Sequence, residues 1–379
     1  MMITPKRRAA AAAMTAILLT IPAGAHAAVH REGRHGHRHP HRTAHRKPTP
    51  PSPSAVATIR ELPVTFSVVN RNTSRVPCAT DGKPYTIAGT LILPAGATPS
   101  GVTLYVHGLG FGAYFWHFTA VPGYDFVGYE AEHGHASVII DRLGYGASGK
   151  PRGAGSCIGG QASVLHQVIQ SLRHGDYDVS GVPAPSFSRV GLVGHSVGGE
   201  LVEVEAYSFR DIDALGVMDF VDGDYSPLAY ETFAVDGANC ALGGQDQGPG
   251  GPGGYSPFGA TLADFDAVMF HDADPAVVAS ANATRSLDPC GDILSILTAA
   301  GVDLLNIGTI NVPIAFVWGQ DDALFPDALP WAQTQETLYG QSPKVTNIEL
   351  PDTGHAVTLE RSAPQLQQAM NAWLDANGL

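Results

Sequence analysis

The clearest chemical pattern in the chain is Gly194-His-Ser196-Val-Gly198. The apolar run Val190–Val193 precedes it and is typical of a buried strand, and the stretch Gly198–Phe209 that follows has a helical pattern. A serine on a strand-to-helix turn has a strained, exposed backbone, and the flanking glycines let the two elements approach closely. The pattern therefore predicts that Ser196 is a nucleophile and does not merely cap the helix.

A serine hydroxyl reacts only when a base takes its proton and an acid orients that base. Both partners follow Ser196 along the chain. Asp321 and Asp322 come directly after the apolar run Ile314–Trp318, and His355 comes shortly after the run that ends at Leu350. The expected catalytic set is thus a serine, a carboxylate and a histidine, each at the end of a strand.

The elements that must position these residues alternate between strands and helices. We expect eight strands, at Leu62–Val69, Tyr85–Leu93, Val102–Val106, Ser137–Ile140, Val190–Val193, Leu215–Val221, Ile314–Trp318 and Val345–Leu350. We expect helices at Gln161–Arg173, Gly198–Phe209, Leu329–Leu338 and Ala363–Leu374. This alternation predicts an α/β fold in which a mostly parallel eight-stranded sheet carries helices on both faces and begins with an antiparallel pair.

One interval, at about residues 224–306, interrupts this alternation. It contains a Gly/Pro-rich stretch at 247–255 and short helical segments, and a structureless loop of that length is unusual in a compact domain. We interpret it as a cap inserted over the carboxyl edge of the sheet, where open α/β sheets bind ligands. The expected domain extends over residues 55–379.

The N-terminus has the features of an export signal. Three basic residues within the first eight precede an apolar run, Ala9–Ile21, and the small-residue site Ala25-His-Ala27. This pattern predicts a signal peptide over 1–27; the alternative is an uncleaved anchor, for which the run is short. Residues 28–54 are rich in His, Arg and Pro and are expected to be a disordered linker, although such a tract can also bind metals or anionic surfaces.

Charge separates the two parts of the chain. Nine of the 22 Lys and Arg residues lie in residues 1–47, which leaves residues 48–379 with 13 basic and 34 acidic groups and a net charge of −21. A domain this acidic repels polyanions, so we expect no nucleic-acid partner. No apolar run after residue 27 is expected to cross a membrane, and the oligomeric state stays unassigned.

If the protein is exported, we expect its four cysteines to form disulfides, because an even number in an oxidising compartment favours them. Three pairings are possible. We favour Cys240 with Cys290, since both lie in the inserted interval, and Cys78 with Cys157, since both lie in loops that flank the early strands.

From residue 60 onward the chain resembles the α/β-hydrolase superfamily. The resemblance rests on His107-Gly108, on the block Asp141–Pro151, on the serine turn, and on the Asp322 and His355 blocks. It implies that Asp322, three residues after Gly319, is the acid; Asp321, or Asp222 or Asp224 one strand earlier, are the alternatives. It also implies an oxyanion hole formed by the backbone amides of Leu109 and Val197.

The resemblance implies an exported serine hydrolase, like an esterase or a lipase, which cleaves a small carboxylic ester through an acyl-enzyme. No cofactor and no metal are expected in the domain. The alternatives are an aminopeptidase or amidase that binds an ammonium group with acids of the cap, a lyase or cofactor-free oxidase, and a binding protein. The aromatic run Phe111–Phe118 lines a pocket or packs in the core. Glu200, on the helix after Ser196, belongs to a buried polar network or to the solvent face, and receives no role.

Secretion of the full chain from a bacterial host should release a protein that begins at Ala28, because the small side chains at Ala25 and Ala27 fit a signal peptidase. Intact mass and N-terminal sequencing of the secreted protein test this. As a control, Ala27→Leu should block cleavage. A secreted wild-type protein that still begins at Met1 would show that this segment is not a cleaved signal.

Overall fold

The computed structural model describes residues 59–379 except 97, 224 and 326–333. The predicted signal peptide (1–27) and linker (28–54) lie outside the described residues. Residues 55–379 form one compact unit. The expected helix at 329–338 is described only from residue 334, and residues 334–338 are helical.

The described part of this unit contains a nine-stranded sheet in the order β11-β10-β7-β6-β3-β4-β2-β1-β5. The strands are β1 Arg60–Val69, β2 Pro84–Leu93, β3 Gly101–Val106, β4 Ser137–Ile140, β5 Asp178–Val179, β6 Arg189–His195, β7 Ala214–Met218, β10 Ile314–Gly319 and β11 Val345–Leu350. The strands from β11 to β4 are parallel, whereas β2, β1 and β5 join by antiparallel pairing. The eight expected strands are present; the ninth, β5, has two residues and is too short to produce a periodic pattern.

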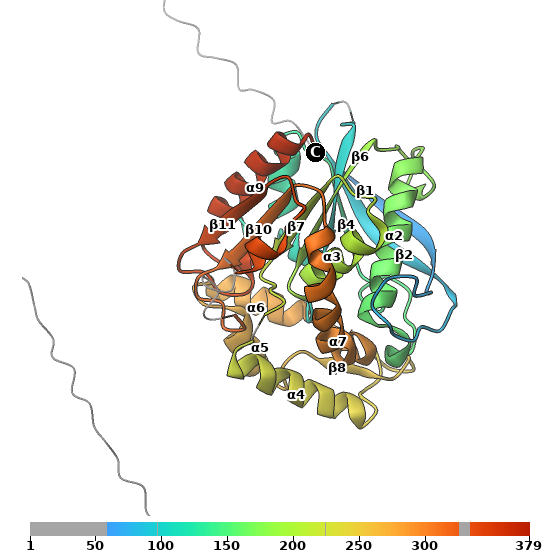
Figure 1. Ribbon diagram of the computed structural model, residues 1–379, viewed down its shortest axis with the longest axis vertical. Coiled ribbons are helices and arrows are strands. Elements are labelled where there is room, and N and C mark those ends of the chain that lie inside the picture. The colour runs from blue at the N-terminus through green and yellow to red at the C-terminus, as the bar shows by residue number, and fades with distance from the viewer. Residues whose placement is uncertain (1–58, 97, 224, 326–333) are drawn as a thin grey trace, which may run out of the picture. The chain divides into compact units, whose positions relative to one another are not determined.

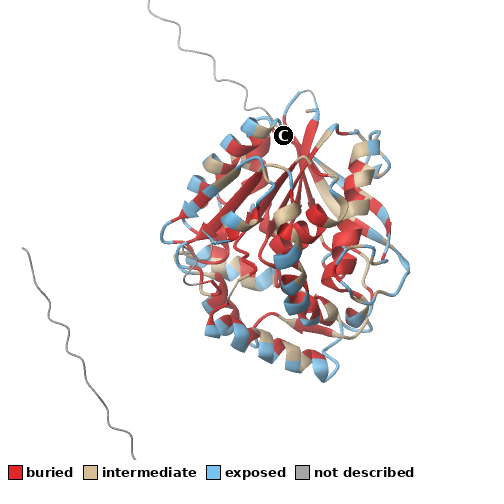
Figure 2. Cartoon of the chain, viewed as in Figure 1, coloured by how far each residue is buried: buried red, intermediate tan, exposed pale blue. Residues whose placement is uncertain are grey.

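The parallel strands in the middle of the sheet are buried along their length, which explains their continuous apolar sequences. Helices cover both faces (Figure 1). On one face α2 (Ile158–His174) packs against α3 (Val197–Phe209), and on the other α1 (Phe126–Glu132) packs against α9 (Ala363–Asn377). Figure 2 shows that burial is concentrated in the strands and the inward helix faces. Helix α1, with seven residues, was not expected from the sequence.

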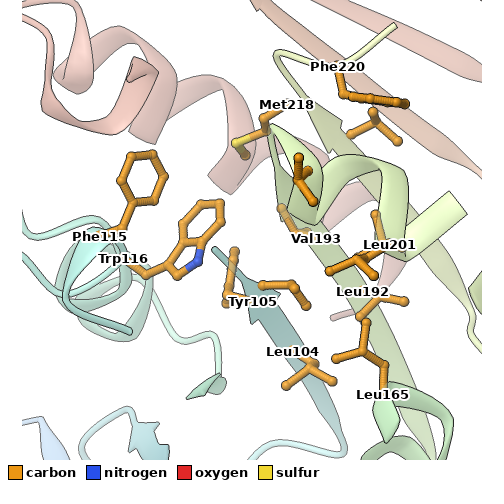
Figure 3. Close-up of a cluster of buried hydrophobic side chains, with 14 of the residues drawn as sticks. Leu104, Tyr105, Phe115, Trp116, Leu165, Leu192, Val193, Leu201, Met218 and Phe220 are labelled. Carbon is orange, nitrogen blue, oxygen red and sulfur yellow. The ribbon is translucent and has the colours of Figure 1, made fainter. Parts of the chain in front are cut away.

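Large side chains fill the two layers beside β3 and β6. Tyr105 of β3 lies with its ring 5.0 Å from Trp116 and 5.6 Å from Phe126. Figure 3 shows Leu165 and Leu201, from α2 and α3, on the other side of these strands. All five side chains are almost completely buried. The strands that end at the candidate site are therefore fixed by packing from both faces.

The stretch between β7 and β10 is the interval for which the sequence predicts an inserted cap. It contains α4 Pro227–Ala241, β8 Tyr255–Pro257, α5 Leu262–Met269, α6 Pro275–Thr284, β9 Leu287–Pro289 and α7 Cys290–Asn306. Helices α4, α5 and α6 gather at the end of the sheet opposite to the C-terminus (Figure 1). Local caps define the helix starts: Ser226 accepts a hydrogen bond from Ala229 N, and Thr261 with Asp264 forms a capping box.

Helix α7 departs from one expectation. The stretch Cys290–Thr309, which includes α7, is long and apolar enough to cross a membrane by length and composition alone. The sequence predicts no such stretch after residue 27. In the fold this helix packs against α2, α3 and α4, and it carries the buried carboxyl groups of Asp292 and Asp303. These contacts are those of a helix that packs on one side within a folded domain, whereas Leu294, Leu297, Leu304 and Leu305 are exposed on it.

Two disulfides join segments that are distant in sequence. Cys78 is bonded to Cys157 at the start of α2, and Cys240 near the end of α4 is bonded to Cys290 at the start of α7. These are the two pairings that the sequence favours. The second bond closes a loop with a sequence separation of 50 that contains β8, α5, α6 and β9.

Replacing both Cys240 and Cys290 by serine should lower the free energy of unfolding by about 2–5 kcal/mol, because the unfolded chain gains the freedom of an open loop. Urea unfolding of the double variant and of the wild type measures this difference. The variant C78S/C157S, which removes the other disulfide, is the matched comparison. An unchanged urea midpoint in C240S/C290S would contradict the expectation.

Candidate functional site

Ser196 occupies the turn between β6 and α3. Its backbone has φ 56° and ψ −128°, a conformation that is costly for a residue with a side chain. A side chain at Gly194 or Gly198 would prevent this turn, since a Cβ at Gly198 would lie 2.4 Å from Val106 O and one at Gly194 would lie 2.0 Å from Gly198 O. The glycine spacing therefore reflects a close packing of backbones around Ser196, whose residue surface is 6% exposed.

His355 and Asp322 form a buried pair. His355 Nδ1 lies 2.7 Å from Asp322 Oδ2, and the other carboxylate oxygen of Asp322 accepts a hydrogen bond from Leu324 N at 2.8 Å. In the neutral imidazole, Nδ1 donates to the carboxylate and Nε2 carries no proton. His355 Nε2 is buried and has no hydrogen-bond partner among the described residues. It is therefore available to accept a proton.

His195 connects this pair to the serine turn. It precedes Ser196, its Nε2 donates to the carbonyl oxygen of His355 at 2.7 Å, and the two imidazole rings lie 4.9 Å apart. Burial, with a smaller effect of nearby His355, lowers the pKa of His195 well below its usual value, so its imidazole is neutral. A histidine that the sequence marks only as flanking a motif thus holds the backbone of His355 beside Ser196.

The alternative acids lie elsewhere. Asp321 is partly exposed, and its carboxylate lies 3.8 Å from the ring of His271. Asp222 accepts a hydrogen bond from Gln335 Nε2 at 2.6 Å, and Asp224 lies outside the described residues. Of these candidates that the structure describes, only Asp322 is hydrogen-bonded to His355.

Asp219, at the end of β7, was not identified from the sequence. It is buried, its Oδ1 accepts a hydrogen bond from Gly319 N at 2.8 Å, and burial together with the nearby Asp322 raises its pKa well above the usual value. Its bond to Gly319 fixes the start of the loop that carries Asp322. A lone aspartate after a strand gives no sequence signal of such a role.

The turn after β3 lies directly against Ser196. A Cβ at Gly108 would be 2.8 Å from Ser196 Cβ. The Gly108 carbonyl accepts hydrogen bonds from His107 Nδ1 at 2.8 Å and from Arg142 Nη2 at 3.4 Å, and His107 Nε2 accepts from Arg142 N. Since the peptide is planar and trans, the Leu109 N–H points away from these donors.

The cap holds this turn from the other side. Arg142 forms a fully buried ion pair with Asp292 of α7 at 3.0 Å. Gly110 N donates to Asp288 Oδ1 at 2.8 Å, and Ser286 N donates to Gly110 O at 2.9 Å. Burial raises the pKa of Asp288 to about 7. These contacts have no signal in the sequence, because they join residues about 150 positions or more apart that carry no shared local motif.

The aromatic run after the turn divides between core and cap. Trp116 packs against Tyr105 in the core, and Phe115 stacks on His195 with ring centroids 4.3 Å apart. Phe111 lies 5.5 Å from Phe265 of α5. Of the two sequence interpretations, core packing holds for these three members: Phe111, Phe115 and Trp116 are fully buried, and Phe111 and Phe115 pack against His195 of the serine turn.

Metal-ligating side chains occur together in three places among the described residues. The groups are His166 with Glu205 and Asp211, His271 with Asp321 and Asp352, and Glu203 with Asp222 and Asp303. None of them contains Ser196, Asp322 or His355. The three groups are therefore separate from the predicted catalytic residues.

Comparison with known proteins gives a family and a fold. A family model described as the alpha/beta hydrolase family matches residues 104–366. The structure is similar to a malate-bound thermophilic esterase from Thermogutta terrifontis, with 19% identity, a TM-score of 0.58, and 83% of this chain and 100% of that chain covered. A putative aryl esterase from Burkholderia cenocepacia has 18% identity, a TM-score of 0.55, and coverage of 83% and 98%. The enol-lactonase from Burkholderia xenovorans has 16% identity, a TM-score of 0.55, and coverage of 79% and 99%. The search of curated proteins found no match.

Gly108→Ala should lower both stability and turnover, because the added methyl group meets Ser196 Cβ and the backbone oxygen of His195 at about 3 Å. Gly301→Ala, on α7, is the matched control; no atom lies within 4 Å of the added methyl there, so stability should be unchanged or slightly higher. Thermal unfolding and initial rates on a chromogenic ester measure both variants. Equal melting temperatures for the two would contradict the close packing at Gly108.

Proposed function

Because the chain belongs to the alpha/beta hydrolase family, we propose that it is an exported serine hydrolase that cleaves carboxylic esters through an acyl-enzyme. The observation that carries the proposal is the pair of Asp322 and His355 beside the strained turn of Ser196, with His355 Nε2 unprotonated and without a partner among the described residues. Such a pair is what a serine hydroxyl needs in order to act as a nucleophile.

In the proposed reaction Ser196 Oγ attacks the ester carbonyl carbon while His355 Nε2 takes the hydroxyl proton. Asp322 stabilises the imidazolium that results. Collapse of the tetrahedral intermediate expels the alcohol, which receives the proton from His355, and leaves the acyl group on Ser196. Water then attacks the acyl-enzyme with His355 as base, and the acid product leaves.

The negative oxygen of the tetrahedral intermediate requires hydrogen-bond donors. We assign this role to the N–H groups of Val197 and Leu109. Val197 begins α3, and the first N–H groups of a helix have no partner within it. The Leu109 N–H belongs to the peptide whose carbonyl is held by His107 and Arg142, so its direction is set before substrate arrives.

Two observations support ester over amide substrates, and a third supports export. Three of the cap acids that could bind an ammonium group have other partners: Asp236 accepts from Gly259 N, Asp264 caps α5, and Asp266 accepts from Asn282. The structurally similar proteins include two named as esterases and one as an enol-lactonase. Two disulfides suit an oxidising compartment.

Ser196→Ala should reduce turnover of nitrophenyl esters by roughly 10⁶-fold, and Asp322→Asn by roughly 10⁴-fold, because each removes part of one proton-transfer unit. Ser188→Ala, at an exposed serine before β6, is the control and should keep the wild-type rate. Melting temperatures establish that the variants are folded. Substantial esterase activity in S196A would remove Ser196 from the proposed role.

The choice between substrates is made on the same preparations with aminoacyl and peptidyl nitroanilides. Turnover that depends on Ser196 and occurs only with esters supports the proposal. A preference for anilides with a free amino terminus would instead identify an aminopeptidase.

A further inference from the structure

Four carboxyl groups meet within the fold, outside the pair formed by His355 and Asp322. Glu200 and Glu203 lie on α3, Asp222 follows β7, and Asp303 lies on α7; we call these four residues the buried acidic cluster. Three of the side chains are completely buried, and Asp222 is 3% exposed. One carboxylate oxygen from each of Glu203, Asp222 and Asp303 lies within 4.8 Å of the other two. Three separate elements of the chain thus direct carboxylates toward one point.

The structure describes no positive charge that balances this cluster. None of the four carboxylates forms an ion pair with a described Lys, Arg or His. The segment 326–333 contains no basic residue in its sequence. Burial raises the pKa of all four groups, that of Asp222 to about 7. Four buried acids without a counter-charge oppose folding at neutral pH unless a cation or protons neutralise them.

Neutral donors satisfy only part of the cluster. Gln335 Nε2 donates to Asp222 at 2.6 Å and to Glu203 at 3.1 Å, Tyr207 donates to Asp303 at 2.6 Å, and Tyr339 donates to Glu203. One buried oxygen of Glu203 has no hydrogen-bond partner among the described residues, and the second oxygens of Asp222 and Asp303 receive no N–H or hydroxyl hydrogen bond there, although these two carboxyl groups interact with each other. These oxygens are available to bind a positively charged ligand.

Glu200 gives an independent indication of a ligand. It lies outside the group of three, it is completely buried, and neither of its carboxylate oxygens has a hydrogen-bond partner among the described residues. Apart from burial, its strongest electrostatic interactions are with Asp303, Asp222 and Glu203, in that order, so its carboxylate lies near the other three. The cluster therefore presents five buried carboxylate oxygens that receive no hydrogen bond from an N–H or hydroxyl donor among the described residues.

We propose that the buried acidic cluster is a structural calcium site. Calcium binds six to eight oxygens at about 2.3–2.6 Å in a flexible geometry, so ligand oxygens on opposite sides of the ion are about 5 Å apart. Three carboxylate oxygens that lie within 4.8 Å of one another can coordinate one such ion. Magnesium requires shorter bonds and a near-ideal octahedron, and zinc favours nitrogen and sulfur ligands, which this cluster lacks.

The ion would connect the helix that begins at the serine turn to the cap. Glu200 lies one turn after Ser196 on α3, and Asp303 lies on α7. Helix α7 is bonded to α4 through Cys290, and its Asp292 pairs with Arg142, which holds the turn after β3. Calcium at this point would fix α3 against α7 and the segment after β7. Its expected effect is on stability, and it does not depend on the proposed ester hydrolysis.

The test uses the intact secreted protein. Elemental analysis after gel filtration in calcium-containing buffer should find about one calcium per chain. A chelator should remove it and lower the melting temperature by about 5 °C or more, and added calcium should restore the loss. Magnesium at the same concentration should not restore it. The proposal would be overturned if no calcium is bound and the melting temperature changes with neither chelator nor calcium. An equal response to magnesium would also overturn it.

Variants separate a bound ion from simple acid repulsion. Glu200→Gln should weaken calcium binding at least about tenfold, yet in chelator its melting temperature should equal or exceed that of the wild type, since one buried charge is gone. Asp303→Asn provides the same test from α7. Glu205→Gln, a buried glutamate of α3 beside His166 and outside the cluster, is the matched control and should keep the wild-type calcium response. An unchanged calcium response in both E200Q and D303N would overturn the assignment.

Discussion

The strained backbone of Ser196 is the constraint on which the other features of the site depend. Its φ of 56° is held because β3, β6 and α3 approach each other more closely than side chains would permit at Gly108, Gly194 and Gly198. The packing of α2 and α3 on one face and of Tyr105 and Trp116 on the other keeps these strands in place (Figure 3). Packing across the whole sheet therefore stabilises the strained turn.

Buried hydrogen bonds and an ion pair join the cap to the sheet. The turn after β3 is held by His107 and Arg142 from the sheet side and by Asp288 and Asp292 from the cap side. Breaking the buried pair of Arg142 and Asp292 would leave an uncompensated charge, which is much more costly than losing an exposed ion pair. A change in the cap is thus transmitted to the amide that we assign to the oxyanion hole.

The sequence predicted the features that have a local pattern and missed those that join distant residues. Eight strands, the serine turn, the Asp322–His355 partnership and both disulfides have local motifs or a constrained set of pairings. The two-residue strand β5 is too short to have a period, and the contacts of Arg142, Asp219 and Asp288 depend on tertiary proximity alone. Glu200, Glu203 and Glu205 illustrate the limit clearly: glutamates usually lie on a solvated helix face, and only the fold shows that all three are buried.

The disulfide between Cys240 and Cys290 determines what proteolysis within its loop would do to the protein. It encloses the Gly/Pro-rich stretch and the segments that carry Phe265 and Asp288, which contact the turn after β3. A protease that cut the chain within this loop would produce two polypeptides that remain joined through sulfur. The pieces would keep their contacts with the sheet, so a nicked molecule would separate into fragments only after reduction.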